Sequence, residues 1–225
     1  KFRLSFLVTF SAVFGFLLSS NYINYFSLSI LIISGFFITG SSIINNQIIE
    51  KDSDKLMKRT KNRPLPTNKI SSRNALFISL ALSITGLILM ILFLNKLTAL
   101  LSFFSLIIYT FLYTPLKKVG PIAVFVGAIP GALPPLIGWA ASTNDISLEA
   151  LIIFSIQFIW QFPHFWAIAW VSDDDYTKAG FKMLPGNKGK STAFIIERVY
   201  GFAQLVSGGK FQTALLYFEV ISNYT

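Results

Sequence analysis

The sequence predicts an all-α fold, a polytopic bundle of transmembrane helices. The first observation is composition, because 53% of the 225 residues are hydrophobic and only 13% are charged. The second is that apolar runs long enough to cross about 30 Å of hydrocarbon recur along the chain. The third is that Lys and Arg are concentrated in alternate connections between these runs, which is typical of a chain that crosses the membrane several times.

Six spans are predicted. The first is short and starts near residue 1 without the charged region and cleavage site of a signal peptide, so we interpret it as a truncated membrane helix. The fifth contains several Pro and Gly residues and is predicted to bend beside a cavity, although helix packing alone explains the same pattern. The predicted spans are Leu4 to Leu18, Ser27 to Ile44, Ala75 to Leu94, Leu97 to Leu112, Ile122 to Ala141 and Leu148 to Val171.

The basic residues predict the topology. Lys and Arg are retained on the cytoplasmic side of short loops. With Lys1 and Arg3 on that side, every Lys and Arg up to Lys190 except Lys96 falls on it too. The net charge of +9 is therefore mostly a topology signal. A basic chain can also bind nucleic acid, but no nucleic-acid motif is present, so we expect membrane lipid and no nucleic acid as partner.

Several chemistries are excluded by residues that the chain lacks. It has no Cys, which excludes disulfides, thiolate metal sites and Cys nucleophiles. It also contains no Gly-rich phosphate loop and no G-x-S-x-G sequence. The familiar motifs of soluble enzymes are therefore absent.

The stretch from Asn45 to Pro66 places carboxylates and cations at the end of an apolar run, where charge is costly and indicates function. If the helix that begins near Ser27 continues through it, Asn46, Glu50 and Asp54 share one face, because four residues turn about 40° past a full helical turn. These oxygen ligands suit Mg²⁺, which binds one or two carboxylates together with water and phosphate oxygens. The predicted substrate is a phosphate or diphosphate.

A second acidic stretch, Asp173 to Lys182, follows the sixth span on the same predicted side of the membrane. Asp174 and Asp175 could hold a second cation and share a diphosphate with the first stretch, while nearby Lys and Arg neutralise the phosphate oxygens. A solvated loop with local salt bridges, such as Asp174 with Lys178, explains this stretch equally well on its own.

Candidate phosphate-binding cations occur in two places. Arg59 and Arg63 flank the first acidic face, and Arg binds phosphate oxygens through a bidentate fork. Lys117 and Lys118 follow Tyr113 where the fourth span ends, although Lys after a span is also ordinary positive-inside sequence.

The only His of the chain, His164, lies inside the sixth span between Trp160 and Trp166. An intramembrane His beside a Pro can be a hydrogen-bonded structural group, a proton carrier or an axial metal ligand, and the spacing leaves all three open. The aromatic residues around it suit a flat apolar ligand, or serve as anchors at the membrane interface.

Five blocks of sequence together resemble the UbiA-type intramembrane prenyltransferases, and within that family the heme-farnesylating branch. The resemblance implies a helical bundle around a cavity open towards the membrane, with the two acidic stretches facing each other through Mg²⁺ and a diphosphate. It implies transfer of the farnesyl group of farnesyl diphosphate to a vinyl group of protoheme IX (heme b), with water addition, to form heme O. The blocks are DKLMKRTKNRPLP (Asp54 to Pro66), YTPLKK (Tyr113 to Lys118), GALPPLIGWAA (Gly131 to Ala141), WQFPHFWAIA (Trp160 to Ala169) and DDYTKAGFKMLP (Asp174 to Pro185).

The resemblance also implies roles for individual residues. The first motif departs from the family's N-D-x-x-D-x-x-x-D pattern, because Gln47 and Glu50 stand where the family has Asp, and a carboxamide adds no charge for the metal. The implied metal-binding and catalytic residues are Asn46, Glu50, Asp54, Asp174 and Asp175. The implied diphosphate-binding residues are Arg59, Arg63, Tyr113, Lys117, Lys118 and Lys178, and the candidate heme-binding residues are Trp160, His164 and Trp166.

The setting and the alternatives follow from the same blocks. We expect an integral protein of the bacterial cytoplasmic (inner) membrane, with the acidic stretches on the cytoplasmic side and heme-pathway or oxidase-assembly proteins as partners. Residues 1–195 are expected to form the bundle and residues 196–225 a divergent tail, so that the bundle is incomplete at its C-terminal end.

Two other functions stay open. One is a prenyltransferase with another aromatic acceptor, against which the block around His164 argues. The other is a truncated, non-catalytic bundle that binds a prenyl diphosphate or heme. A transporter is disfavoured, because the acids cluster at helix ends on one face and not near the middle of the membrane.

Overall fold

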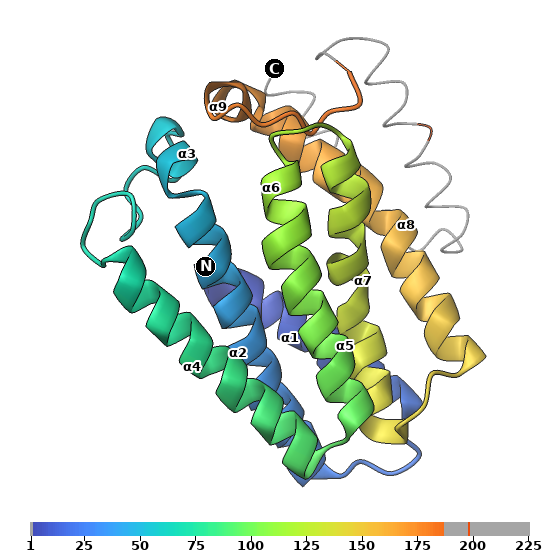
Figure 1. Cartoon of the computed structure of the whole chain (residues 1–225). Helices are drawn as coiled ribbons and strands as arrows, with labels where there is room; N and C mark the ends of the chain where they lie inside the picture. Colours follow the sequence, from blue (N-terminus) through green and yellow to red (C-terminus); the bar gives the residue numbers. More distant parts are fainter. Residues whose placement is uncertain (1, 187–197, 199–225) are drawn as a thin grey trace.

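The structure is a computed structural model that describes residues 2–186 and residue 198, and within this part every regular element is helical (Figure 1). The tail predicted for residues 196–225 lies outside the described residues, except for Arg198. The elements are α1 (Phe2–Ser19), α2 (Tyr25–Ile49), α3 (Lys51–Leu56), α4 (Ser72–Phe93), α5 (Lys96–Ile107), the π-helix η1 (Ile108–Tyr113), α6 (Thr114–Leu116), α7 (Ile122–Thr143), α8 (Leu148–Val171) and α9 (Asp173–Lys178).

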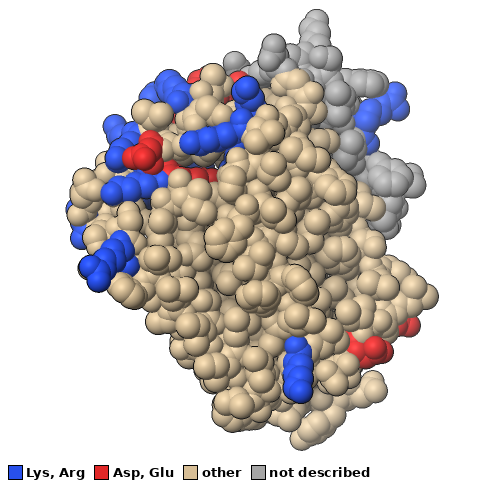
Figure 2. Space-filling view, in the orientation of Figure 1, with Lys and Arg blue, Asp and Glu red and all other residues tan. Residues whose placement is uncertain are grey.

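Six helical runs in the described part are long and apolar enough to cross a membrane. Five are α1, α2, α4, α7 and α8, and the sixth is the continuous run Lys96–Leu116, formed by α5, η1 and α6. Charged side chains gather at two ends of the molecule, with an uncharged belt between them (Figure 2). The predicted all-α fold and the six predicted spans are confirmed, and the chain is a multi-pass integral membrane protein.

Helix α7 lies at the centre of the bundle and packs against α1, α5 and α8. Small residues allow the close approach of α1, because a Cβ at Gly15 would collide with the carbonyl of Pro135 and one at Gly138 with the carbonyl of Ala12. Helix association in lipid depends on such close packing, since lipid is as apolar as the helices themselves. The core formed here includes Leu31 of α2, which is fully buried.

The prolines of α7 lie inside one uninterrupted helix. Pro has no N–H, so Pro135 leaves the carbonyl of Gly131 without its helical partner. Gln161 of α8 supplies the missing donor, with Nε2 at 3.2 Å from that oxygen. A Cβ at Gly131 would collide with the side chain of Gln161, so the glycine admits the amide. The Gly and Pro content of the fifth span thus serves contacts with α1 and α8.

Candidate active site

The first acidic face lies where α2 passes into α3. Backbone hydrogen bonds from Glu50 N to Asn46 O (2.9 Å) and from Asp54 N to Glu50 O (2.7 Å) continue the helical pattern across the junction. Asn46, Glu50 and Asp54 are 0%, 5% and 0% exposed. Asp52, on the opposite side, has a side chain that is 89% exposed. The predicted shared face of Asn46, Glu50 and Asp54 is therefore confirmed.

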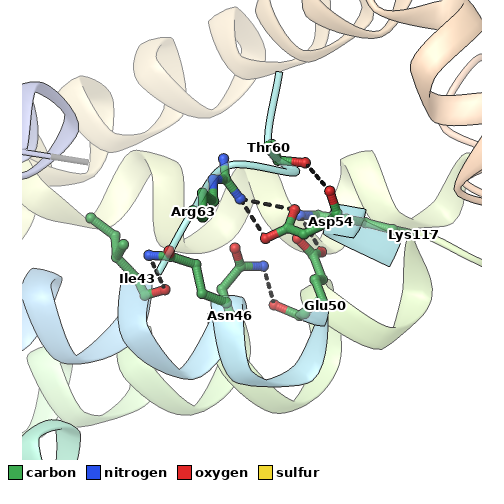
Figure 3. Close-up of polar contacts among 9 residues, drawn as sticks. Ile43, Asn46, Glu50, Asp54, Thr60, Arg63 and Lys117 are labelled. Atoms are coloured by element: carbon green, nitrogen blue, oxygen red, sulfur yellow. Dashed lines mark hydrogen bonds and ion pairs between the residues drawn. The ribbon is translucent and has the colours of Figure 1, made fainter. Parts of the chain in front are cut away.

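Each buried carboxylate on this face has a cationic partner (Figure 3). Arg63 Nη1 donates to both oxygens of Asp54, at 2.9 Å and 2.7 Å. Lys117 Nζ donates to Oε1 of Glu50 at 2.7 Å. A buried charge is tolerated only when it is paired and hydrogen-bonded. The arrangement therefore pairs both carboxylates with cations at the end of a membrane helix.

Lys117 is held from three sides. Its Nζ lies 4.6 Å from the ring centroid of Tyr113 and 5.7 Å from that of Phe181, in addition to the contact with Glu50. Burial by itself lowers the pKa of Lys117, but the charge of Glu50 and the hydrogen bond between them outweigh it, so the pKa lies above its ordinary value. Lys117 is therefore a fixed cation at neutral pH, whereas the neighbouring Lys118 is exposed.

The π-helix η1, which is part of the fourth span, packs against α2 beside the acidic face. Asn46 Nδ2 donates to Oγ1 of Thr114 (3.2 Å), and Thr114 donates to the carbonyl oxygen of Tyr109 (2.8 Å). A π-helical turn contains an extra residue and is frequent at functional sites. Tyr109 and Tyr113, both from η1, line the cavity described next.

A cavity of about 490 Å³ lies against the acidic face. Its charged end, which we call the mouth, consists of Glu50, Asp54, Arg59, Arg63 and Lys117. Away from the mouth the lining is mostly apolar and aromatic, with a few polar side chains such as Ser105, Gln157 and Gln161. Helix α7 contributes Gly127, Pro130, Gly131 and Pro134. The cavity that was predicted beside the fifth span is present. Its chemistry suits a ligand with an anionic head and an apolar body.

The aromatic wall contains His164 and Trp160 of α8. Their rings stack, with centroids 4.9 Å apart and planes 25° from parallel. Phe165 packs on Tyr113, with centroids 5.5 Å apart, and so joins α8 to the mouth. Trp166 is not part of the cavity lining and contacts Phe162, with centroids 5.9 Å apart. The structure thus brings two of the three candidate heme-binding residues to the cavity.

The second acidic stretch contacts the first through the carboxylate of Asp175 and through an apolar cluster that includes Met57 and Phe181. Asp175 Oδ1 accepts a hydrogen bond from the backbone N–H of Lys58 (3.2 Å), and Oδ2 accepts one from that of Arg59 (3.4 Å). Asp174 and Lys178 are exposed, and no ion pair joins them in the described part of the chain. Neither Asp174 nor Asp175 lines the cavity. Among the described residues no group of three His, Cys, Asp or Glu is placed to hold a metal ion.

Two polar residues of the site were missed from the sequence. Gln161 lines the cavity and supports α7, and its signal was a polar side chain inside a span. Thr114 joins Asn46 to η1, and nothing in its sequence context distinguishes it from the many Thr residues that bond only to their own helix.

The sequence model of the UbiA prenyltransferase family matches residues 7–222. The chain belongs to this family. A UbiA relative, the protoheme IX farnesyltransferase of Cytophaga hutchinsonii, is 50% identical over 199 residues, which cover 87% of this chain and 70% of that protein. The protoheme IX farnesyltransferase of Flavobacterium psychrophilum is 48% identical over 200 residues, which cover 87% of this chain and 66% of that protein. The matched part spans about two thirds of the length of these relatives.

Solved structures support the UbiA fold. A UbiA homolog from Aeropyrum pernix K1, in its apo form, superposes with a TM-score of 0.76 at 21% identity, over 92% of this chain and 78% of that one. A UbiA homolog from Archaeoglobus fulgidus, described as bound to DMAPP and Mg²⁺, superposes with a TM-score of 0.67 at 19% identity, over 92% of this chain and 72% of that one. The predicted family membership and its UbiA-like bundle are confirmed.

Proposed function

We propose that the protein transfers the farnesyl group of farnesyl diphosphate to a vinyl group of heme b, with addition of water, to form heme O. The observation that carries the proposal is the charged mouth at one end of an aromatic-lined cavity. An allylic diphosphate has the matching shape, with an anionic head and an apolar tail. The names of the relatives from Cytophaga and Flavobacterium support farnesyl and heme as the two substrates.

The mouth binds the diphosphate. Arg59, Arg63 and Lys117 contribute positive charge, and an Arg fork matches two phosphate oxygens at once. Because Arg63 and Lys117 are already fixed by Asp54 and Glu50, little side-chain freedom is lost when the ligand arrives. Phosphate binding at preorganised cations stabilises the charge that develops on the leaving group.

The acidic face fits Mg²⁺ in donor type. Glu50 and Asp54 present carboxylate oxygens from successive turns, and Asn46 lies one turn before them. Mg²⁺ needs only one or two carboxylates when substrate phosphates complete its shell. Glu50 and Asp54 would hold the ion, and Asp174 and Asp175, which do not line the cavity, are not included in the proposed metal site. Bound there, Mg²⁺ would neutralise the departing diphosphate. The Archaeoglobus homolog, which binds DMAPP together with Mg²⁺, supports a role for this ion.

The cavity wall serves the second half of the reaction. Tyr109 and Trp160 supply aromatic rings that stabilise an allylic cation, and the mostly apolar lining limits the access of water until the acceptor is reached. Trp160 and His164, stacked on one another in the cavity wall, supply aromatic rings on which a porphyrin packs. We further propose that the mouth faces the cytoplasm of a bacterial inner membrane, because the basic connections after α2 and α6 lie at that end.

The proposal is tested with the chain in membranes supplied with heme b and farnesyl diphosphate, with and without Mg²⁺, followed by mass spectrometry of the extracted heme. The expected product is a hydroxyethylfarnesyl heme that forms only with Mg²⁺. It is lost in Asp54→Asn and kept in Asp52→Asn, which removes the same charge from an exposed position. Binding of farnesyl diphosphate without any heme product would favour the non-catalytic alternative and contradict the proposal.

A further inference from the structure

We propose that Asp175 is a positioning residue. Its carboxylate holds the turn after α3 in place, so that the side chain of Arg59 reaches the diphosphate at the mouth. The inference rests on the proposed function, because the diphosphate is the ligand that Arg59 meets. It gives Asp175 a role different from metal binding.

The backbone after α3 depends on Asp175 for two of its hydrogen bonds. Helix α3 ends at Leu56, and the residue that follows, Met57, is extended, with φ of −94° and ψ of 132°. The N–H groups of Thr60 and Lys61 bond back to the carbonyl of Met57 at 3.1 Å and 3.0 Å. The two amides between them, of Lys58 and Arg59, take no backbone acceptor among the described residues. In this exposed turn both amides donate to oxygens of Asp175 in place of a backbone acceptor.

An apolar contact also joins the turn after α3 to the segment that starts with α9. Met57, Ala179 and Phe181 are buried together, with 3%, 6% and 6% exposure, and Tyr176 packs on them. Backbone N–H of Lys182 also donates to the carbonyl of Lys117 at 2.7 Å. These contacts fix the segment that starts with α9 against the mouth, independently of Asp175. Asp175 then holds the turn that carries Arg59 against this fixed segment.

The three cations of the mouth differ in whether a carboxylate pairs with them. Arg63 pairs with Asp54 and Lys117 pairs with Glu50, so two of its three cations already have carboxylate partners. Arg59 takes part in none of the ion pairs of the described residues, although it lines the cavity. The oxygens of Asp175 accept hydrogen bonds from the backbone N–H groups of Lys58 and Arg59. The guanidinium of Arg59 thus remains available for an incoming anion.

The experiment compares Asp175→Asn with Asp174→Asn in the full chain, reconstituted in lipid. Asp174 is the adjacent residue, carries the same charge and is exposed, so it is the matched control. Hydrogen exchange is measured at the amides of Lys58 and Arg59, with α7 as the check that the bundle is folded. We expect exchange about tenfold faster in Asp175→Asn, the size expected for weakening a hydrogen bond to a charged group, and no change in Asp174→Asn.

The same two variants are titrated with inorganic diphosphate and Mg²⁺. Asp175→Asn is expected to weaken diphosphate binding about fivefold, and Arg59→Gln should have an effect of the same size. The double variant should lose little further affinity, because the two changes remove the same interaction. In turnover, the KM for farnesyl diphosphate rises while kcat and the Mg²⁺ concentration for half-maximal rate stay the same. A shifted Mg²⁺ requirement, or unchanged amide exchange in Asp175→Asn, would overturn the inference. Absence of heme product alone would count against the proposed function, because the exchange measurement does not depend on turnover.

Discussion

The two acidic segments of the chain use the same side chain in different ways. In the first segment Asp54 is fully buried, lines the cavity and accepts two hydrogen bonds from Arg63. In the second, Asp174 is exposed and Asp175 bonds to the backbone of Lys58 and Arg59. The comparison shows that burial and the nearest cation decide what a carboxylate does. The number of Asp residues in a segment does not.

The largest effect is expected where a buried pair is broken. Asp54→Asn leaves the guanidinium of Arg63 without its carboxylate, and such a loss destabilises a protein by about 3 to 5 kcal/mol. Thermal unfolding in detergent measures this loss, and farnesyl transfer should fall by at least about a hundredfold. Asp52→Asn is the control, since its pair with Lys55 is exposed and its removal should be nearly silent. Equal losses of stability and activity in the two variants would show that burial does not distinguish these two carboxylates.

A second test uses adjacent lysines. Lys117→Met leaves Glu50 buried without its cation, so we expect about 3 kcal/mol less stability and a strongly raised KM for farnesyl diphosphate. Lys118→Met removes the same charge from an exposed position and should change both quantities little. Steady-state kinetics with unfolding curves of the two proteins give the comparison directly, and a larger effect at Lys118 would contradict the site.

A third test concerns a neutral buried group. Gln161→Leu leaves the carbonyl of Gly131 without a donor, at an expected destabilisation of about 1 to 3 kcal/mol. Pro135→Ala restores an N–H within α7, so the loss caused by Gln161→Leu should be smaller in that background. A double-mutant cycle of unfolding free energies measures the coupling. Additive effects of the two changes would show that Gln161 supports α7 in some other way.

The smallest effect is expected from pH. The folded-state pKa of Lys117 is raised above its ordinary value of 10.5, so the stability contributed by its charge is complete below that value. It is lost only as the pH rises through the raised pKa. Between about pH 7 and pH 9 the difference in stability between the protein and Lys117→Met should therefore stay constant. A difference that shrinks within this range would mean that Lys117 loses its proton at a lower pH than expected for a Lys whose pKa is raised by contact with Glu50.

Much of the fold could be predicted from the sequence, because its signals are local. Apolar length located six spans, and the four-residue spacing of Asn46, Glu50 and Asp54 located their common face. Arg63 could be named as a candidate cation because it lies in the same connection as Asp54. The fold and this part of the site therefore followed from neighbours along the chain.

The contacts that complete the site could not be predicted, because they join distant segments. Lys117 and Glu50 are 67 residues apart, and Lys58 and Asp175 are 117 apart. Their pairing depends on how α2, η1 and α9 approach one another, which composition and periodicity do not describe. For the same reason the sequence left Asp175 as a candidate ligand and did not indicate its contact with the backbone.

The most direct test of the account is the affinity for farnesyl diphosphate in lipid, measured with and without Mg²⁺ in three proteins. These are the unaltered chain, Asp54→Asn and Asp174→Asn. The account predicts that Mg²⁺ strengthens binding in the unaltered chain and in Asp174→Asn, and that Asp54→Asn removes this dependence. Loss of Mg²⁺ dependence in Asp174→Asn, with Asp54→Asn unaffected, would show that the second acidic segment carries the metal and would contradict the account.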